Sequence, residues 1–144
     1  MNNIIYKLAT TRAELGGAFA VRREVFIIEQ SIAEEEEWDG LDDECLQFVA
    51  RSGRKVIGTA RVRFPSSDYA KIERMAVLKK FRRQGIGAGI LHYVERELKR
   101  QGVTEEILHA QLIAVPFYQA CGFTAVSTTF YEAGIEHIKM QKRL

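Results

Sequence analysis

The most constraining feature of this sequence is a cationic, glycine-rich turn between an apolar run and an amphipathic segment. Residues 79–89 read KKFRRQGIGAG, after the run IERMAV and before ILHYVEREL. The run predicts a strand, and the apolar side chains from Ile86 to Leu98 recur at helical spacing until Gly102, a residue type common at helix ends. A strand, a tight turn and a helix are therefore predicted in succession.

The turn has the composition of an anion-binding site. Gly85 and Gly87 have no Cβ, so the backbone can approach a ligand closely. The following helix directs its unpaired N–H groups and the positive end of its dipole at the same point. Lys80, Arg82 and Arg83 can add charge-assisted contacts to outer phosphates. This combination predicts a pyrophosphate site.

Two other phosphate-binding turns do not fit the sequence. The dinucleotide fingerprint requires G-x-G-x-x-G, whereas the glycines at 85, 87 and 89 are one residue short and lack a series of parallel βαβ units. The P-loop pattern G-x-x-x-x-G-K-[ST] is absent. Spacing excludes both alternatives.

The hydrophobic pattern of the whole chain predicts a mixed α/β arrangement. We expect strands at residues 4–8, 46–50, 56–64, 70–77 and 107–113, helices at 12–30, 86–101 and 116–121, an acidic loop at 31–44 and a closing hairpin at 126–131 and 137–140. Alternation in 56–64 predicts a half-buried hairpin with 46–50. Thr10 and Thr11 are placed to cap the first helix. This order predicts a mixed sheet with helices on both faces.

Length and composition predict one soluble domain spanning residues 1–144. A chain of 144 residues with 47% apolar content needs no disulfide, because it buries about two-thirds of the surface that its unfolded form exposes. Cys45 and Cys121 are the only cysteines, the amino terminus lacks the apolar core of a signal peptide, and no apolar run approaches the ~20 residues of a membrane span. We expect a cytoplasmic protein without a membrane partner.

Charge is unevenly distributed, although the net charge is only +2. Residues 34–44 carry eight acids and no base, whereas residues 79–83 carry four bases and no acid. The acidic segment is more simply a solvated loop than a surface that attracts an amine. So small a net charge does not indicate a nucleic-acid partner.

Several stretches match motifs of one enzyme superfamily. R-x-x-G-x-G, carried by Arg82, Gly85 and Gly87, resembles motif A of the GNAT N-acetyltransferases, which bind acetyl-CoA there. F-Y-x-x-x-G-F at residues 117–123 resembles the second motif of that family. R-x-x-V-F-x-x-E-Q at 22–30, followed by E-W-D at 37–39, looks like the ElaA-like branch of small bacterial GNATs. The resemblance covers nearly the whole chain.

The resemblance implies an α+β GNAT fold, in which a mixed and mostly antiparallel sheet has a splayed central strand pair and helices on both faces. It implies an N-acetyltransferase that moves an acetyl group directly from acetyl-CoA to a primary amine. The cofactor-binding residues that it implies are Met75, Ala76 and Val77 beside the pantetheine arm, and Arg82, Arg83, Gln84, Gly85, Ile86, Gly87 and Ala88 around the pyrophosphate. Residues 107–113 are the strand expected to splay away and admit the arm.

The resemblance also suggests groups for proton transfer. An amine must lose a proton before it attacks, and the thiolate of CoA needs a proton as it leaves. Tyr118 matches the frequent general acid of the family, with a core aromatic as the alternative. Glu73 lies where the family often places a base, with an ion pair to Lys71 or Arg61 as an equal alternative.

The other reactive side chains have structural interpretations. His92 and His109 are expected to be packing or surface residues rather than bases. Cys121 is expected to be a small buried hydrophobe, because GNATs transfer the acyl group directly. No Cys/His cluster has metal-ligand spacing, so no metal is predicted.

The resemblance implies an acceptor site around the first helix and the loop after it. The candidate residues there are Arg22, Phe26, Glu29, Trp38 and Asp39. Trp38 can either bind a cationic amine by a cation–π contact or hold the loop against the core. We expect a small-molecule or peptide amine as acceptor, and a homodimer is left open.

Two rival functions are considered. A GNAT-fold module could hold acyl-CoA as a sensor or scaffold without efficient turnover. A toxin that acetylates aminoacyl-tRNA is the other, but the near-neutral charge and the acidic segment disfavour a nucleic-acid partner.

Overall fold

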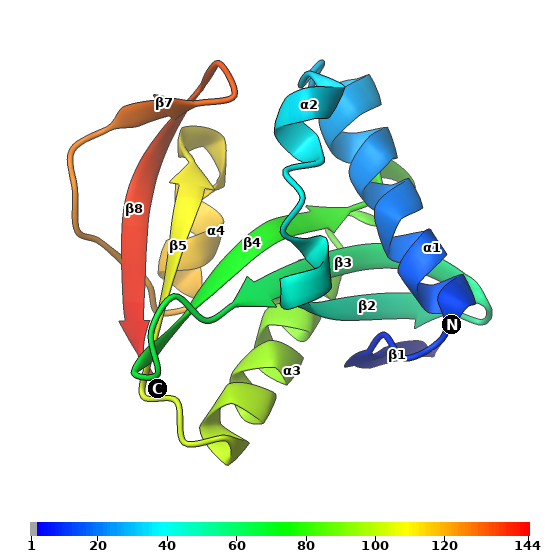
Figure 1. Cartoon of the computed structure of the whole chain (residues 1–144), viewed down its shortest axis with the longest axis horizontal. Helices are drawn as coiled ribbons and strands as arrows, with labels where there is room; N and C mark the ends of the chain where they lie inside the picture. The colour runs from blue at the N-terminus through cyan, green and yellow to red at the C-terminus, as the bar shows by residue number, and fades with distance from the viewer. Residues whose placement is uncertain (1–2) are drawn as a thin grey trace.

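An eight-stranded mixed sheet forms the centre of the computed structural model, which describes residues 3–144 (Figure 1). The strands are β1 (Ile4–Leu8), β2 (Leu46–Ser52), β3 (Lys55–Arg63), β4 (Tyr69–Val77), β5 (Glu105–Gln111), β6 (Thr124–Ala125), β7 (Phe130–Glu132) and β8 (Ile135–Arg143). They lie in the order β1-β2-β3-β4-β5-β8-β6, and β7 pairs with β8. Among these strands only β4 and β5 are parallel neighbours. The predicted mixed, mostly antiparallel sheet is confirmed.

Helices cover both faces of the sheet, as predicted. They are α1 (Arg12–Arg22), which continues as the π-helix η1 (Arg23–Glu29), α2 (Glu34–Glu37), α3 (Ile86–Arg100), α4 (Val115–Ala120) and the short 3-10 helices η2 (Asp42–Glu44), η3 (Lys79–Phe81) and η4 (Leu112–Ala114). In Figure 1, α1 lies on one face and α3 on the other. None of the helices within residues 3–144 is long and apolar enough to cross a lipid bilayer.

The first helix begins at Thr11, one of the two predicted caps. The Thr11 side chain accepts a hydrogen bond from the Glu14 backbone N–H at 3.1 Å, and Glu14 Oε1 accepts one from the Thr11 N–H at 3.3 Å. This capping box satisfies donors that the helix itself cannot pair. A hydrogen bond from Lys7 and the backbone donors lower the pKa of Glu14 to about 2, so the cap is ionised at neutral pH.

The central strands β4 and β5 separate after a short stretch of pairing. Residues 69–72 pair with residues 105–108, and beyond them β5 pairs only with β8. In Figure 1 the two strands diverge toward the end of the molecule that carries α2 and β7. The splayed central pair of a GNAT fold is therefore present, and it leaves one main-chain edge of β4 without a strand partner.

A β-bulge in β4 accompanies the separation. Thr59 pairs with Ala76 and Arg61 pairs with Glu73, so three steps along β4 match two along β3. Arg74 lies within this stretch with a φ of 55°, in a region that residues other than glycine rarely adopt. An extra residue bends a strand and increases its twist, which helps to turn the end of β4 away from β5.

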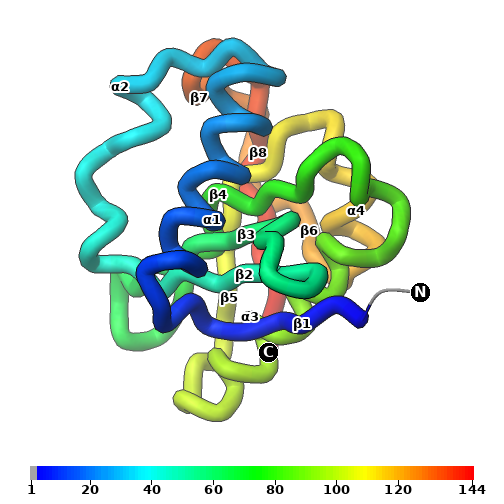
Figure 2. The backbone as a smooth tube through the Cα atoms, turned by 90° about the vertical axis from the view of Figure 1, so that its right-hand side faces the viewer, coloured from blue at the N-terminus to red at the C-terminus, as the bar shows by residue number. Residues whose placement is uncertain are grey.

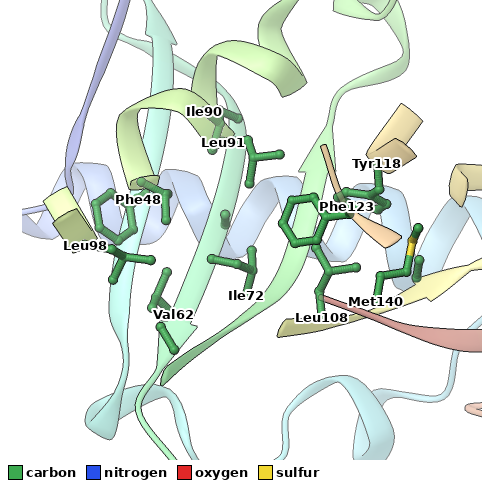
Figure 3. Close-up of a cluster of buried hydrophobic side chains, with 14 of the residues drawn as sticks. Phe48, Val62, Ile72, Ile90, Leu91, Leu98, Leu108, Tyr118, Phe123 and Met140 are labelled. Carbon is green, nitrogen blue, oxygen red and sulfur yellow. The ribbon is translucent and has the colours of Figure 1, made fainter. Parts of the chain in front are cut away.

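Two apolar clusters hold the layers together, one on each face of the sheet. Figure 3 shows the larger, in which α3 and α4 pack on the strands through Ile90, Leu91, Leu98, Tyr118, Phe123, Phe48, Val62, Ile72, Leu108 and Met140. The smaller lies under α1 and η1 and includes Ala18, Val21, Val25 and Phe26. Each buried Leu or Phe contributes about 1.5–3 kcal/mol. Because Ile72 lies on β4 and Leu108 on β5, the larger cluster also ties together the two halves of the splayed sheet.

Two strand predictions differ from the structure because neighbouring segments change the environment. β3 is buried on both faces rather than one: Thr59 and Arg61 are 0% exposed beneath α1 and the acidic segment. The predicted strand 107–113 begins earlier and ends at Gln111, because the chain turns through η4 into α4, which has Pro116 in its first turn.

The predicted strand 126–131 is interrupted. The side chain of Ser127 accepts a hydrogen bond from the Lys139 N–H at 2.9 Å, where a continuous ladder would use a backbone carbonyl. Such side-chain bonds compete with strand pairing, so residues 126–129 lie in no strand, and β6 and β7 on either side of them pair with β8. The predicted turn is confirmed, with φ of 50° at Ala133 and 73° at Gly134.

Candidate active site

A cavity of about 410 Å³ opens where β4 and β5 separate. Its walls come from η1, α2, β4, β5, α4 and β7, and both views place α2 and β7 at the same end of the molecule (Figures 1 and 2). Apolar groups such as Phe26, Ile72 and Leu108 line it together with several charged groups. A cavity of this size suits a small-molecule ligand.

The unpaired edge of β4 forms one wall. Met75, Ala76 and Val77, the residues implied for the pantetheine arm, all line the cavity. An extended ligand can pair with such an edge as an added strand does. One acceptor is already used, because the Val77 carbonyl accepts a hydrogen bond from Arg82 Nε at 2.9 Å. The rest of this edge fits an extended arm.

The glycine turn leads into an uncapped helix end. Gly85 has a φ of 78° and immediately precedes α3, and no side chain caps the helix. The first helical hydrogen bond runs from the Gly89 N–H to the Gly85 carbonyl at 3.0 Å. The N–H groups of residues 86–88 therefore lack intrahelical acceptors, which suits a bound anion.

The glycines of this turn have different physical explanations. Gly85 needs its positive φ, and a Cβ there would meet open space. A Cβ on Gly87 would lie 3.3 Å from the ring of Phe117, and a Cβ on Gly89 would collide with the ring of Tyr6. Packing against β1 therefore accounts for Gly89, and packing against α4 limits the space at Gly87. The sequence had suggested ligand approach for both Gly85 and Gly87.

Arg82 is held by protein groups at the rim of the cavity. Its guanidinium bonds both carboxylate oxygens of Glu29, at 2.7 and 2.8 Å, and so links the turn to the end of η1. Bidentate pairs of this kind fix geometry as well as adding energy. Lys80, Arg83 and Gln84 are exposed to solvent around the same turn. Lys80 and Arg83 are therefore better placed than Arg82 to meet outer phosphates.

Tyr118 lies in the cavity wall on α4. Its ring packs edge to face against Phe117 and Phe123, with centroid distances of 5.0 and 5.7 Å, and only 7% of the residue is exposed. Burial, with a smaller effect of Cys121, raises the pKa of Tyr118, and no hydrogen bond from residues 3–144 opposes the shift. The phenol is therefore protonated at neutral pH, as a proton donor must be.

Glu73 reaches the cavity within a group of cations. Its carboxylate lies 3.1 Å from Arg63 Nε, 3.2 Å from an Arg61 nitrogen and 3.3 Å from Lys71 Nζ. Burial alone would raise the pKa of Glu73, but the Arg63 hydrogen bond and the three charges outweigh it and lower the pKa. Both ion pairs weighed from the sequence are present, and the carboxylate is a weak proton acceptor.

Acids of the 34–44 segment neutralise two buried arginines. Arg22 bonds Glu37 at 2.7 Å and Asp42 at 2.6 Å, and Arg61 bonds Asp39 at 2.6 Å and Asp42 at 3.1 Å. We call these five residues the arginine cluster. Both arginines are 0% exposed, and a buried charge without a partner is strongly unfavourable. The solvated-loop interpretation is therefore wrong for Glu37 and Asp42, and Asp39 pairs with Arg61 although it is exposed. Residues 34–36, 43 and 44 are exposed.

Trp38 holds the acidic segment against α1. Its ring meets Phe19 edge to face with centroids 5.9 Å apart, and the Arg22 guanidinium lies 4.9 Å from the Trp38 ring centroid. The second interpretation of Trp38, an aromatic that fixes the loop, matches these contacts.

The predicted acceptor residues therefore fall into two groups. Phe26 lines the cavity, and Glu29 pairs with Arg82 at its rim. Arg22, Trp38 and Asp39 lie in or against the arginine cluster, where protein groups already contact them. The structure does not bring these three side chains to the cavity.

Other side chains that the sequence analysis did not select as site residues also reach the cavity. Gln30 and Gln111 exchange amide hydrogen bonds of 3.2 and 2.9 Å between η1 and β5. His109 and Glu132 form a contact of 2.6 Å between β5 and β7. Alternation in EILHAQ is the signal that places residues 109 and 111 on one face of the strand. No spacing rule could pair them with partners so distant in sequence.

No three His, Cys, Asp or Glu side chains gather into a possible metal site anywhere in residues 3–144.

Comparison with known proteins agrees with this geometry. Residues 12–144 match the family model described as an acetyltransferase (GNAT) domain. The uncharacterized N-acetyltransferase YjcF of Bacillus subtilis is 40% identical over 136 residues, which cover 94% of this chain and 96% of that protein.

Solved structures share the whole fold. A crystal structure from Lactobacillus plantarum matches with a TM-score of 0.92 at 27% identity, covering 99% of both chains. Escherichia coli ElaA matches with a TM-score of 0.81 at 19% identity, covering 97% of this chain and 99% of its own, a likeness that shows the common fold. On the family model and the sequence relative together, the chain belongs to the GNAT family of acetyltransferases.

Proposed function

We propose that this protein is an N-acetyltransferase that uses acetyl-CoA to acetylate a primary amine on a small molecule or peptide. The observation that carries the proposal is the cavity between the diverging ends of β4 and β5, with the protonated phenol of Tyr118 in its wall. Family membership supports acyl transfer as the reaction class.

The donor side of the site has the right groups for a long, anionic ligand. The free N–H groups of residues 86–88 and the exposed cations Lys80 and Arg83 suit a pyrophosphate. The unpaired edge of β4 suits an amide-containing arm that leads into the cavity. Acetyl-CoA, when bound, supplies an electrophilic thioester carbonyl there.

Tyr118 is the proposed general acid. A buried phenol keeps its proton, and it is a weak acid for the same reason. A thiolate that leaves beside this buried phenol is also partly removed from water, so its affinity for the proton rises too. The Tyr118 hydroxyl then protonates the sulfur or donates a strong hydrogen bond to it.

Glu73 is proposed to accept a hydrogen bond from the incoming nitrogen. Its lowered pKa keeps it ionised, so it can orient the amine. The same lowered pKa makes Glu73 a poor group for removing a proton outright.

Binding and turnover test this proposal in sequence. Acetyl-CoA at about 100 times its Kd should stabilise the fold by about 2.7 kcal/mol, raising the thermal midpoint by about 5–10 °C. NAD and ATP serve as controls, because each has a pyrophosphate or triphosphate but no pantetheine arm. Absence of any shift at millimolar acetyl-CoA would remove the proposal.

The turnover measurement distinguishes the enzyme from the alternative, an acyl-CoA-binding module without efficient turnover. Release of the CoA thiol in the presence of primary amines supports the enzyme. A normal thermal shift with no amine-dependent thiol release would favour the binding module.

A further inference from the structure

A histidine and a carboxylate meet in the cavity wall without a role in the scheme above. His109 comes from β5 and Glu132 from β7, and His109 Nδ1 lies 2.6 Å from Glu132 Oε1. A carboxylate accepts hydrogen bonds, so the proton of this contact belongs on Nδ1. The lone pair of Nε2 is then free to accept a proton, which is how an acid-oriented imidazole acts as a base.

The imidazole is held in place by packing as well as by this bond. The ring of Phe130 meets His109 edge to face at 5.0 Å between centroids, and Phe130 also stacks on His137 at 6.2 Å. His137 is fixed in turn, because its Nδ1 lies 2.7 Å from the Ile135 carbonyl. The His109 side chain is nevertheless 25% exposed, so a ligand can reach it.

The position of His109 complements that of Tyr118. Leu108 and Ala110 belong to the apolar cluster that contains Tyr118. Since side chains alternate along a strand, His109 projects from the opposite face of β5. Both residues line the same cavity. The splay thus brings a proton donor from one side of the sheet and a proton acceptor from the other to a single space.

Three other titratable groups of the cavity, Glu73, Glu37 and His137, are less suited to remove a proton. Glu73 is surrounded by three cations. Burial raises the pKa of Glu37, but both of its carboxylate oxygens are engaged, by Arg22 at 2.7 Å and by Arg74 at 3.2 Å, and so are not free to meet an amine. His137 is buried and stacked.

We propose that His109 is the general base of the transfer reaction and that Glu132 is its positioning residue. This inference rests on the proposed function. His109 Nε2 takes one proton from the acceptor ammonium and passes it to water. The neutral nitrogen then bonds to the acetyl carbon as the carbon–sulfur bond breaks. Tyr118 gives its proton to the departing sulfur, so CoA leaves as the thiol. The nitrogen then gives its second proton to the Tyr118 phenolate, which leaves a neutral amide.

The pair also indicates the class of acceptor. A dedicated base is needed for an amine that is protonated at neutral pH, whereas an amine that is already neutral can attack without one. An imidazole backed by the Glu132 carboxylate also attracts a cation. The acceptor is therefore a basic alkylamine, such as a lysine side chain or a polyamine.

The test compares His109→Asn, Glu132→Gln and the control Glu136→Gln, whose carboxylate lies on β8 outside the cavity. Asparagine keeps a donor near the Nδ1 position but cannot accept a proton at neutral pH. With spermidine or Nα-acetyllysine amide, kcat should fall about 100-fold for His109→Asn and about 10-fold for Glu132→Gln. With 2,2,2-trifluoroethylamine, a weakly basic amine, kcat should change less than about threefold. The control should match the wild type throughout.

Nitrogen-15 NMR of the His109 ring gives a readout that does not depend on turnover. The wild type should carry its neutral-state proton on Nδ1, and Glu132→Gln should shift protons toward Nε2. Imidazole added to His109→Ala should restore part of the lost rate. If a variant does not fold, the wild-type spectrum decides: a proton on Nε2 would overturn the assignment.

The outcomes distinguish this inference from the function on which it rests. Normal turnover of alkylamines by folded His109→Asn would remove the base and leave the acetyltransferase intact. A wild-type protein that releases no CoA thiol with these three amines would remove the inference about the acceptor, and one that releases none with any primary amine would remove the acetyltransferase as well.

Discussion

At the scale of the residue, Tyr118 offers the sharpest test of the chemistry. Replacing it with phenylalanine keeps the packing against Phe117 and Phe123 and removes only a hydroxyl that no group in residues 3–144 hydrogen-bonds. We expect Tyr118→Phe to lower kcat by about 10- to 1000-fold. Acetyl-CoA affinity and the thermal midpoint should stay close to those of the wild type. Steady-state kinetics with the best amine checks this, and an unchanged kcat would make Tyr118 structural.

Individual residues were predictable where a local rule fixed them. Thr11 followed from helix capping, and a tight turn at Gly85 from the glycine-rich stretch between a predicted strand and a predicted helix, although Gly85 itself was explained by ligand approach rather than by its positive φ. Arg22 and Asp39 were assigned to the acceptor because their roles depend on partners that no local pattern identifies. A buried arginine looks the same in sequence as an exposed one until its carboxylates are located in space.

At the scale of the element, the exposed cations of the turn before α3 should act on binding rather than on chemistry. Arg83→Glu places a negative charge beside the site proposed for the pyrophosphate, so the KM for acetyl-CoA should rise about 3- to 10-fold with kcat little changed. The effect should shrink as salt is added, because exposed charges are screened. Arg54→Glu, an exposed change in the β2–β3 turn, is the matched control. Equal KM values for the two variants would argue against the proposed phosphate site.

In the acidic segment, Asp42 should contribute to the stability of the fold, because it bonds both buried arginines of the cluster. Asp42→Asn leaves Arg22 and Arg61 short of one charge, and breaking a buried pair costs about 3–5 kcal/mol. Partial exposure of Asp42 reduces this, so we expect a loss of about 2–3 kcal/mol in urea unfolding. Asp43→Asn changes an exposed neighbour and should stay within about 0.5 kcal/mol of the wild type. Similar losses of unfolding free energy in both variants would mean that pairing with the buried arginines does not explain the effect of Asp42.

At the scale of the whole molecule, the sequence predicted the order of the strands and helices but not how they pack against one another. Hydrophobic periodicity predicted the strands and helices on either side of the glycine turn, because those segments have a clear period. The separation of β4 and β5 was expected only from the family resemblance. The hydrophobic pattern of β4 does not indicate the bulge at Arg74. The double burial of β3 depends on the cover that α1 and the acidic segment provide, which only the assembled fold supplies.

The stability of the whole molecule should also depend on pH through Glu106, a fully buried carboxyl group. It is 0% exposed, and both of its carboxyl oxygens are buried without a hydrogen-bond partner among residues 3–144. Burial first, and then the neighbouring Glu95, raise the pKa of Glu106 well above its usual 4.5. A raised pKa in the folded state means that stability is fully present below pH 4.5 and is lost as the pH rises toward the folded value.

Glu106→Gln should therefore stabilise the protein progressively as the pH rises, because the neutral amide never has to take up a proton on folding. The difference in unfolding free energy between the variant and the wild type should be small near pH 4.5 and grow by up to about 1.4 kcal/mol per pH unit above it. Urea unfolding at pH 5, 6.5 and 8 measures this slope, and Glu24→Gln, on the exposed surface of η1, should show none. A difference that stays constant with pH would mean that Glu106 is ionised in the fold and that a partner charge compensates it.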